Sequence, residues 1–566
     1  MPSHDCLSPP SPTSETEAAN DHPWDRRDLR VPREDNTLFA RPPLAETLDT
    51  VAANRALLEN AQADIQGRSL GDLRTWARSQ VVQAAREYTA QFGPVVSDGS
   101  DFETLIVGGH QPSLFHAGVW VKNFAIHAIA SRTHGLAVNL IVDNDTCDRT
   151  DLRIPVKNGG SPSTEAVSFD RSRPAEPWEE SLILDEAQFR SFGERVVQQM
   201  SQWNISPLIG EMWPDAVRHA EGSDCLRDCL TAARHRQERR WGVTNLELPI
   251  SRLCTLDAFL WFSSHLLVNL PRFRDIHNDV LAQYRRVNRI RSHTHPVPEL
   301  KEHDGWHEAP FWVWTADDSR RKHVFARQMD KEIHLSDGTT PFASLRLRPG
   351  MDACCAVETL RELSERGIRL RTRAITTTLF ARLCFADLFV HGIGGAKYDE
   401  MTDCIVGSFY DLPAPGFLTL SATQHLPLSG AFDVTAADQT ALLTHLRELR
   451  YHSDRHVVPG ADANVDALVA EKQRLIAEQH AVRSLAVPRR ERRANSRNNY
   501  ERFRRFQEIN RQLADCTSEQ RARIEKEIES TQMQLATNAV LQDREYSFSL
   551  HPAAKLEPFM TRLWDR

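Results

Sequence analysis

Two histidines and a lysine within residues 108–122, GGHQPSLFHAGVWVK, form the pattern in this chain that best predicts chemistry. A short apolar stretch ends in glycines just before them and an amphipathic stretch follows, so His110, His116 and Lys122 would lie between the end of a strand and a helix. Such a position offers unpaired backbone N–H groups and a positive helix dipole to a phosphate or carboxylate. We assign Gly109, Gln111 and Gly118 to the same anion site. The alternative is that each histidine caps the helix and that Lys122 is a surface lysine.

The loop resembles the HxGH loop of nucleotidyltransferases and class I aminoacyl-tRNA synthetases. His116, Ala117 and Gly118 match its first three positions, and Val119 stands where that loop has its second histidine. The resemblance implies that His116 donates to the phosphates of ATP as charge develops during transfer. His110 would supply the donor that is lost at Val119.

Acidic residues follow the next predicted strand, AVNLIVDND, at Asp143, Asp145 and Asp148. Carboxylates at a strand end can hold a ribose, an amine or a magnesium ion, and the alternative is that they cap the following turn. We expect a site, because both strands of one βαβ unit end in reactive side chains. Cys147 lies among these acids, whose negative charge would raise the pKa of its thiol and disfavour reactivity.

A third candidate is the glycine-rich loop expected in FVHGIGGAKYDEMTD, residues 389–403. A glycine-rich loop alone is weak support, but the preceding element carries Arg371 and Arg373, whose guanidinium groups suit bidentate recognition of a carboxylate or phosphate. The residues assigned to this site are Arg373, His391, Gly392, Gly394, Gly395, Lys397 and Tyr398.

The elements that must position these residues follow from the period of the apolar side chains. TLIVGG, VWVKNFAIHAIASR and AVNLIVDND predict a strand, a helix and a strand, which form a βαβ unit. Two amphipathic helices precede that unit. The predicted fold class is α/β, with a Rossmann-like parallel sheet core, a helical insertion, a small antiparallel hairpin region and a long C-terminal helical hairpin that forms a coiled coil.

Seven segments are expected along the chain. Residues 1–38 have the composition of a disordered tail, 39–170 hold the N-terminal helices and the first half of the core, and 171–300 form the helical insertion. Residues 301–345 form the small antiparallel sheet, and 346–460 form the second half of the core. Heptad spacing, as at Val465, Leu468, Leu475 and Val482, predicts a coiled-coil hairpin over 461–545, with a solvated basic tip, and 546–566 form a C-terminal segment.

Composition narrows the class of function. The apolar runs fall short of the roughly 20 residues that a membrane span needs, and a net charge of −8 disfavours nucleic acid as the main partner. The N-terminus lacks the basic start and apolar run of an export signal. The ten cysteines lack a CxxC pair, so Cys225, Cys229, Cys354 and Cys355 are expected to be buried thiols on helices and not metal ligands. We expect a cytoplasmic protein with a small-molecule substrate and no resident metal.

The order of these features resembles the BshC family, the cysteine ligases of bacillithiol biosynthesis, over most of residues 100–545. Three motifs of that family, a GQQ-GLF-GP-K loop, an acidic EDHD strand end and a GGPGE-Y loop, are matched in part. The matching residues are Gln111, Leu114, Phe115, Gly118 and Lys122 in the first, Asp145 in the second, and Gly392, Gly395 and Tyr398 in the third. The departures are His110, Thr146, Cys147 and Ala396. The resemblance implies a Rossmann core related to class I synthetases and a coiled coil used for dimerisation.

The leading hypothesis is therefore a ligase that joins an amino acid, cysteine in the resembled family, to an amine-bearing small molecule through nucleotide-dependent activation by ATP with Mg²⁺. His110, His116 and Lys122 would stabilise phosphate charge. Asp145 or Asp148 would hold an amine or the metal, and Arg373 with residues 392–398 would hold the acceptor. Two alternatives stay open: a nucleotidyl or sugar-related transferase that uses the HxG loop, and a noncatalytic dimeric scaffold with a vestigial Rossmann domain. A homodimer through the C-terminal hairpin is the expected assembly.

Overall fold

A six-stranded sheet with the strand order β1-β16-β15-β2-β3-β8 carries most of the candidate residues. Its strands are β1 (Thr37–Arg41), β2 (Leu105–His110), β3 (Leu136–Ile141), β8 (Leu246–Pro249), β15 (Leu388–His391) and β16 (Phe417–Thr423). β1 pairs antiparallel with β16, and the other neighbours are parallel. The structure is a computed structural model that describes residues 29–95, 102–159, 161–460, 462–484 and 491–565. The protein is thus a mixed α/β protein with a mostly parallel main sheet.

The βαβ unit predicted from the sequence is present. β2 and β3 are parallel neighbours, and α3 (Ala117–Arg132) connects them. Side chains of β2 alternate between two cores: Leu105 and Val107 enter one, and Ile106 enters the other. A strand buried on both faces needs a continuous apolar run, which explains why LIV precedes the glycines.

Successive strands of the main sheet are placed first on one side of β2 and then on the other. β3 and β8 were added on one side of β2, whereas β15 and β16, later in the sequence, lie on its other side. In open parallel sheets, ligands bind outside the carboxyl ends of the strands at such a reversal. The carboxyl ends of β2, β3 and β15 are therefore the edge at which to look for a site.

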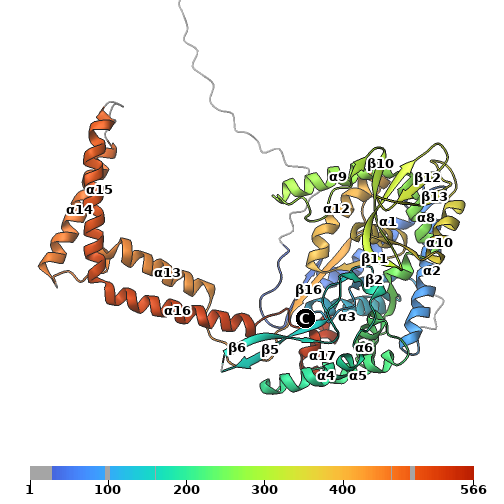
Figure 1. The fold of residues 1–566 in the computed structure, drawn as a ribbon, viewed down its shortest axis with the longest axis horizontal. Coiled ribbons are helices and arrows are strands. Elements are labelled where there is room, and N and C mark those ends of the chain that lie inside the picture. The colour runs from blue at the N-terminus through green and yellow to red at the C-terminus, as the bar shows by residue number, and fades with distance from the viewer. Residues whose placement is uncertain (1–28, 96–101, 160, 461, 485–490, 566) are drawn as a thin grey trace, which may run out of the picture.

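Helices cover both faces of this sheet (Figure 1). One core contains residues of α2 (Leu70–Thr89), α8 (Asp257–Val268), α9 (Leu270–Val287), α11 (Ala374–Cys384) and α12 (Ile393–Tyr410). The other contains residues of α3, α4 (Glu186–Met200), α5 (Ile209–Ala220), α6 (Leu226–Arg240) and α17 (Ala553–Thr561). α1 (Thr47–Glu59) and α2 are the two N-terminal helices that the sequence predicted.

The region predicted as a helical insertion, residues 171–300, also contains a strand of the main sheet. β8 pairs in parallel with β3 and leads into the short α7 (Ile250–Leu253), so the insertion is not purely helical. The preceding hairpin of β5 (Asp151–Asn158) and β6 (Ser161–Ser168) was not predicted either. A four-residue strand such as LELP has too few positions to show a period of two, whereas the surrounding helices show their period clearly.

A second, antiparallel sheet has the order β13-β12-β11-β10-β14. Its hairpin joins β10 (Trp306–Thr315) to β11 (Asp318–Gln328), as predicted, and β9 (Glu302–His303), β12 (Ile333–Ser336) and β13 (Pro341–Leu345) extend it. β14 (Ile368–Thr372), which the sequence assigned to the main core, pairs with β10 instead. α10 (Cys354–Glu365) precedes β14 and ends before Gly367, whose φ is +74°. The main sheet therefore resumes only after α11.

A helical arm extends from the body of the molecule (Figure 1). It consists of α13 (Ala436–Tyr451), α14 (Ala463–Ser484), α15 (Glu491–Cys516) and α16 (Ser518–Leu541). Leu475 of α14 packs against Ile509 of α15, whereas Leu449 of α13 packs against Ile524 of α16. The sequence predicted one hairpin over 461–545, but the arm is two successive helix pairs that begin at α13. The side chain of Val482 lies outside the described residues.

The chain ends and the thiols also differ from expectation in part. Residues 1–28 of the predicted tail lie outside the described residues, but Leu29 is buried against Ile393 and Phe417, and β1 begins at Thr37. Residues 29–38 are therefore packed on the body. The nine described cysteines are free thiols, and Cys354 and Cys355 are exposed, not buried. Among the described helices, each lacks either the length or the apolar composition to cross a membrane.

Candidate functional site

His110, His116 and Lys122 gather at the carboxyl end of β2. His110 is the last residue of that strand, and His116 is the N-cap of α3. Lys122, on α3, donates from Nζ to the carbonyl oxygen of Gly109 at 3.0 Å. Pairing between β2 and β15 ends at Gly108 and Val390, so this contact lies just beyond the last paired residues, at the reversal of the sheet.

Lys122 is a buried cation, 5% exposed. Burial lowers the pKa of its ammonium group to about 8, and the described residues supply a carbonyl oxygen but no carboxylate as its partner. A buried charge without an opposite charge is unfavourable, and groups of this kind concentrate at functional sites. An anion at this position would supply the missing charge.

The two histidines are neutral at pH 7. Burial, then the charges of Lys122 and neighbouring groups, lowers the pKa of His110 to about 3. Burial and the charge of Arg544 lower the pKa of His116 to about 3 as well. His116 Nδ1 accepts from the Gly118 N–H at 3.1 Å, and its Nε2 lies 3.5 Å from Glu545 Oε2. His116 therefore caps α3, as the alternative interpretation of the sequence predicted. His110 has a neutral ring close to Lys122.

Close packing, and not the approach of a ligand, accounts for two of the candidate glycines. A Cβ on Gly109 would lie 2.7 Å from the carbonyl oxygen of Leu140 on β3. A Cβ on Gly118 would collide with the Ala422 carbonyl oxygen and with Arg544. The C-terminal segment also pairs with this loop, since the Phe548 N–H donates to the Phe115 carbonyl at 2.9 Å. The expected anion site at the first turn of α3 is thus covered by protein, which leaves the half-buried His110 and the buried Lys122 as the candidate groups at this strand end.

The substitution Gly109→Ala is expected to destabilise the fold by about 1–3 kcal/mol, because its methyl group must displace the backbone of β3. Gly392→Ala is the matched control. A Cβ on Gly392 meets no atom within 4 Å, and this residue also follows a strand of the main sheet. Urea unfolding of both variants measures the difference. Equal midpoints for the two variants would contradict the packing role of Gly109.

The three acidic residues after β3 have different surroundings. Asp143 is fully buried and accepts from Arg227 at 2.7 Å and from the Ser251 N–H at 2.9 Å, so its role is structural. Asp148 is exposed and lies away from the cavity described below. Asp145 accepts from Gln111 Nε2 at 2.6 Å and from Arg321 at 3.0 Å. Only Asp145 therefore joins a site, and Gln111 links it to the histidine loop.

Cys147 is buried in the strand β4 (Thr146–Cys147). Burial raises the pKa of its thiol to about 11, and Glu176 and Asp148 add to the shift. The raised pKa that the sequence predicted for this thiol is found, with burial and not the neighbouring acids as its larger cause.

Asp145 opens into a cavity of about 360 Å³ between the main sheet and the second sheet. Arg373, the N-cap of α11, lines it, and so do Trp312 and Arg321 of the second sheet. Both guanidinium groups lie on the Trp312 ring, with the carbon of Arg321 at 5.1 Å and that of Arg373 at 4.4 Å from its centroid. Two cations and an aromatic wall suit a small ligand with a carboxylate or phosphate group.

Arg371, in contrast, is held in a buried ion pair and does not line the cavity. It forms a bidentate ion pair with Glu179, at 2.9 and 2.8 Å, and both side chains are buried. Arg371 lies within β14, whereas Arg373 follows that strand as the N-cap of α11, so two arginines that looked equivalent in sequence have different surroundings.

Sequence reasoning missed half of this cavity. Trp312, Arg321 and His323 lie on β10 and β11, in the hairpin that was identified only as a small sheet. Each is about 170 residues from Asp145 in sequence, as the separation of 176 for the Arg321 contact shows. The local signal available was the concentration of Trp, Arg and His in FWVWTADDSRRKHVFAR.

The predicted glycine-rich loop is the first turn of a helix. α12 begins at Ile393 with Gly392 as its N-cap, and Gly394 and Gly395 lie within it. A Cβ on Gly395 would lie 3.0 Å from His391 Nδ1, which explains that glycine by packing. His391 is itself buried, with Nε2 2.9 Å from Asp399 Oδ2.

The remaining residues of this group do not reach the Asp145 cavity. Lys397 lines a separate hollow of about 850 Å³ together with Arg33, His425 and Arg544. The Tyr398 ring lies 6.0 Å from the ring of His295. The structure therefore joins Gln111, Asp145 and Arg373 and leaves His391, Lys397 and Tyr398 apart from them.

The chain matches no protein-family model and no curated protein. Its chemistry therefore has to follow from its own geometry.

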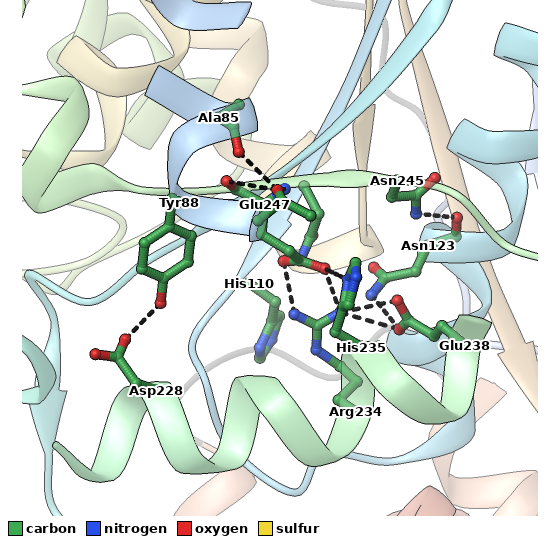
Figure 2. Close-up of polar contacts among 12 residues, drawn as sticks. Ala85, Tyr88, His110, Asn123, Asp228, Arg234, His235, Glu238, Asn245 and Glu247 are labelled. Atoms are coloured by element: carbon green, nitrogen blue, oxygen red, sulfur yellow. Dashed lines mark hydrogen bonds and ion pairs between the residues drawn. The ribbon is translucent and has the colours of Figure 1, made fainter. Parts of the chain in front are cut away.

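A buried polar network beneath the site has the composition of a metal centre. Ligand atoms of His235, Glu238 and Glu247 lie within 4.8 Å of one another. Figure 2 shows, however, that the guanidinium group of Arg234 already lies between the two carboxylates, 2.9 Å from Glu238 and 2.7 Å from Glu247. A cation thus occupies the position that a metal ion would take, and the network is structural.

Proposed function

We propose that this chain is an enzyme that joins the carboxyl group of an amino acid to the amine of a small molecule after nucleotide-dependent activation, as in BshC-like ligases. The observation that carries the proposal is the buried ammonium group of Lys122. It lies beside His110 at the reversal of the sheet without a carboxylate among its described partners. An anionic substrate group, such as a nucleotide phosphate, is the partner that such a group needs.

The order of the parallel strands supports a Rossmann-like core for this enzyme. Numbered along the chain, the parallel strands β2, β3, β8, β15 and β16 are first to fifth, and across the sheet they run 3-2-1-4-5. That is the order of a dinucleotide-binding fold, and the ligand crevice there lies between the first and fourth strands. Lys122 contacts the backbone at that crevice.

ATP fits this edge in part. Its phosphates would lie against Lys122 and His110, with Lys122 as a point charge and the neutral ring of His110 as a hydrogen-bond donor. Mg²⁺ would arrive bound to the nucleotide, because Asp143 is held by Arg227 and Asp145 by Gln111 and Arg321. The amine-bearing acceptor would occupy the Asp145 cavity, with an anionic group against Arg321 and Arg373. Most of the rate enhancement would come from positioning and electrostatics.

The experiment that tests this function uses the purified full chain, ATP with Mg²⁺ and each amino acid in turn. Thermal shift measures nucleotide binding, and isotope exchange of pyrophosphate into ATP measures activation of a carboxyl group through an adenylate. Release of ADP and phosphate with an amine present measures activation through an acyl phosphate. Binding of ATP together with either reaction is expected. A protein that neither binds ATP nor performs either reaction would refute the proposal.

The histidine loop favours this ligase over an HxGH-type transferase. In the transferase, His116 and the first turn of α3 would have to face the phosphates, but His116 caps α3 and Arg544 covers Gly118. Sugar nucleotides are therefore expected to give no thermal shift where ATP gives one.

We also propose that the helical arm forms a homodimer. Large apolar side chains on its described helices are exposed to solvent, among them Leu443, Phe503 and Met533, which are 47%, 56% and 71% exposed. Both helix pairs of the arm carry such side chains: Leu443 on α13 and Met533 on α16 in one pair, and Phe503 on α15 in the other. Light scattering after size exclusion should give twice the chain mass of 64.3 kDa. The double variant Phe503→Glu and Met533→Glu is expected to be monomeric, and a wild-type monomer would refute the proposal.

A further inference from the structure

We propose that His323 is the general base of the Asp145 cavity and that Glu308 positions it. This inference rests on the proposed amide-forming function and adds the group that takes the proton of the acceptor amine. Neither residue belongs to the motifs that the sequence singled out.

A buried carboxylate holds one side of the His323 ring. Glu308, on β10, is 0% exposed, and its Oε1 lies 2.5 Å from His323 Nδ1 on the neighbouring strand β11. Arg373 donates to the same oxygen at 2.7 Å, and the Lys301 N–H donates to Oε2 at 3.2 Å. Both oxygens of the carboxylate are therefore fixed, and its position fixes the ring.

The proton of the imidazole lies on Nδ1. Burial raises the pKa of the Glu308 carboxyl, but the contacts with His323 and Arg373 outweigh it and hold that pKa at about 2. Glu308 is thus ionised at neutral pH. Nδ1 lies 2.5 Å from Glu308 Oε1 and 2.9 Å from Arg373 Nη2. Arg373 Nη2 donates to the same Glu308 oxygen at 2.7 Å, and a carboxylate oxygen so close to a ring nitrogen needs a proton between them, so Nδ1 carries it. Nε2 is then left with its lone pair, the form of the ring that can accept a proton.

The ring lines the cavity that holds the candidate ligand groups. Its neighbour Trp312 lies edge to face with it at 5.0 Å between ring centroids, and Nε2 has no polar contact within the described part of the chain. Asn144 lines the same cavity, is 6% exposed and has an Oδ1 atom that is buried without a hydrogen-bond partner. Nε2, Asn144 Oδ1 and Asp145 are acceptors for an amine, and Arg321 and Arg373 are donors for an anion. The cavity therefore fits a small molecule that carries an amine near a carboxylate or phosphate.

The amine nitrogen forms a bond to the acyl carbon of the activated amino acid, and the bond from that carbon to the phosphate leaving group breaks with its electron pair. The proton of the amine moves to His323 Nε2. The imidazolium ion that results is stabilised by Glu308, and the proton then leaves to solvent through the cavity. General base catalysis of this kind contributes roughly 10²- to 10⁴-fold to a rate.

Diethyl pyrocarbonate tests the state of the ring without an assay of activity, because it acylates an imidazole nitrogen that has a free lone pair. Peptide mapping by mass spectrometry gives a rate for each histidine of the full chain. The matched control is His334 on β12, whose Nε2 lies 3.7 Å from an exposed carboxylate, Glu332. We expect Glu308→Gln to slow acylation of His323 several-fold, and Glu332→Gln to leave acylation of His334 unchanged. We also expect inorganic phosphate to protect His323 but not His334, and Arg321→Met to remove that protection.

A second measurement needs no substitution at the buried Glu308. Nitrogen-15 NMR of labelled histidines at pH 7.5, with His323 assigned by its loss in His323→Asn, is expected to show a protonated Nδ1. The opposite tautomer, or an acylation rate that is the same in Glu308→Gln and wild type, would overturn the proposal.

Measurements of activity distinguish a failure of this inference from a failure of the proposed function. With an active wild-type enzyme, His323→Asn is expected to lower the rate of amine acylation by about 100-fold or more, while His334→Asn leaves it unchanged. An unchanged rate in His323→Asn refutes the general base. A wild type that performs neither activation reaction refutes the ligase, and the acylation and NMR results then still decide the state of His323.

Discussion

Replacing Lys122 with methionine is expected to raise the melting temperature at pH 7 and to remove ATP binding. In the wild-type protein Lys122 is 5% exposed, and burial lowers the pKa of its ammonium group from 10.5 to about 8. That difference corresponds to about 3 kcal/mol of unfavourable free energy while the group is charged. Methionine removes the charge and keeps most of the volume, although the Gly109 carbonyl loses a donor worth about 1 kcal/mol. The net gain expected at pH 7 is about 2 kcal/mol.

The sign of the effect depends on pH in a way that identifies its cause. Between pH 8 and 10.5 the unfolded chain binds more protons at Lys122 than the folded chain, so the free energy of unfolding of the wild type rises with pH over this window. Lys122→Met lacks this rise, and its advantage over the wild type should shrink from pH 7 towards pH 10.5. Urea unfolding at several pH values measures both curves.

Lys331→Met is the control, because this exposed lysine also loses a charge but not a buried one. It should change neither the pH dependence nor ATP binding. A Lys122→Met protein that is less stable at pH 7 would show that the ammonium group has a structural role. One that binds ATP as well as the wild type would refute the role of Lys122 in nucleotide binding.

The fold was predictable where the period of apolar residues was long enough to read. The βαβ unit, the N-terminal helices and the β10–β11 hairpin follow directly from alternation and helical spacing. β8 and β14 are short, and the sheet to which each belongs depends on pairing with residues far away in sequence. The division of the arm into two helix pairs likewise depends on which apolar stripe meets which partner.

The candidate site was predictable at its strand ends and not beyond them. Gln111 and Asp145 meet because the parallel strands β2 and β3 bring their carboxyl ends together. Arg373 reaches the same cavity from the end of β14 in the second sheet. Sequence could not show that Asp143 is neutralised by Arg227, or that the glycine at 118 is required by Ala422. The proposed role of His323 could not be predicted from the sequence for the same reason. It depends on Glu308, a carboxylate on the neighbouring strand, and on a cavity that forms only in the tertiary fold.

Arg234→Met is expected to destabilise the protein by about 3–5 kcal/mol, because it leaves two buried carboxylates without their cation. Arg234 links Glu238 of α6 to Glu247 of β8, and all three side chains are at least nine-tenths buried (Figure 2). Trp120 and Asn123 of α3 donate to Glu238 at 2.6 and 2.8 Å. The network thus joins the sheet to the helix that carries Lys122, and its loss should also weaken ATP binding.

The pH dependence of this variant should be opposite to that of the wild type. In the wild type, burial raises the pKa of Glu247, but Arg234 and His235 outweigh it and hold the pKa at about 2, so this carboxylate stabilises the fold above pH 4.5 and loses that effect as the pH falls towards 2. Without Arg234, burial raises the pKa of the carboxyls, so the folded state gains protons and the deficit of Arg234→Met should shrink as the pH falls from 7 to 5. Urea unfolding across this range measures the deficit.

The triple variant Arg234→Met, Glu238→Gln and Glu247→Gln separates charge from packing. Removing all three charges together leaves no uncompensated carboxylate, so the triple variant should be more stable at pH 7 than Arg234→Met alone, because the cost of a broken buried pair comes mainly from the charge that is left behind. If the triple variant were the less stable of the two, the hydrogen bonds of the carboxylates to α3 and β8, and not the balance of charge, would hold the network together.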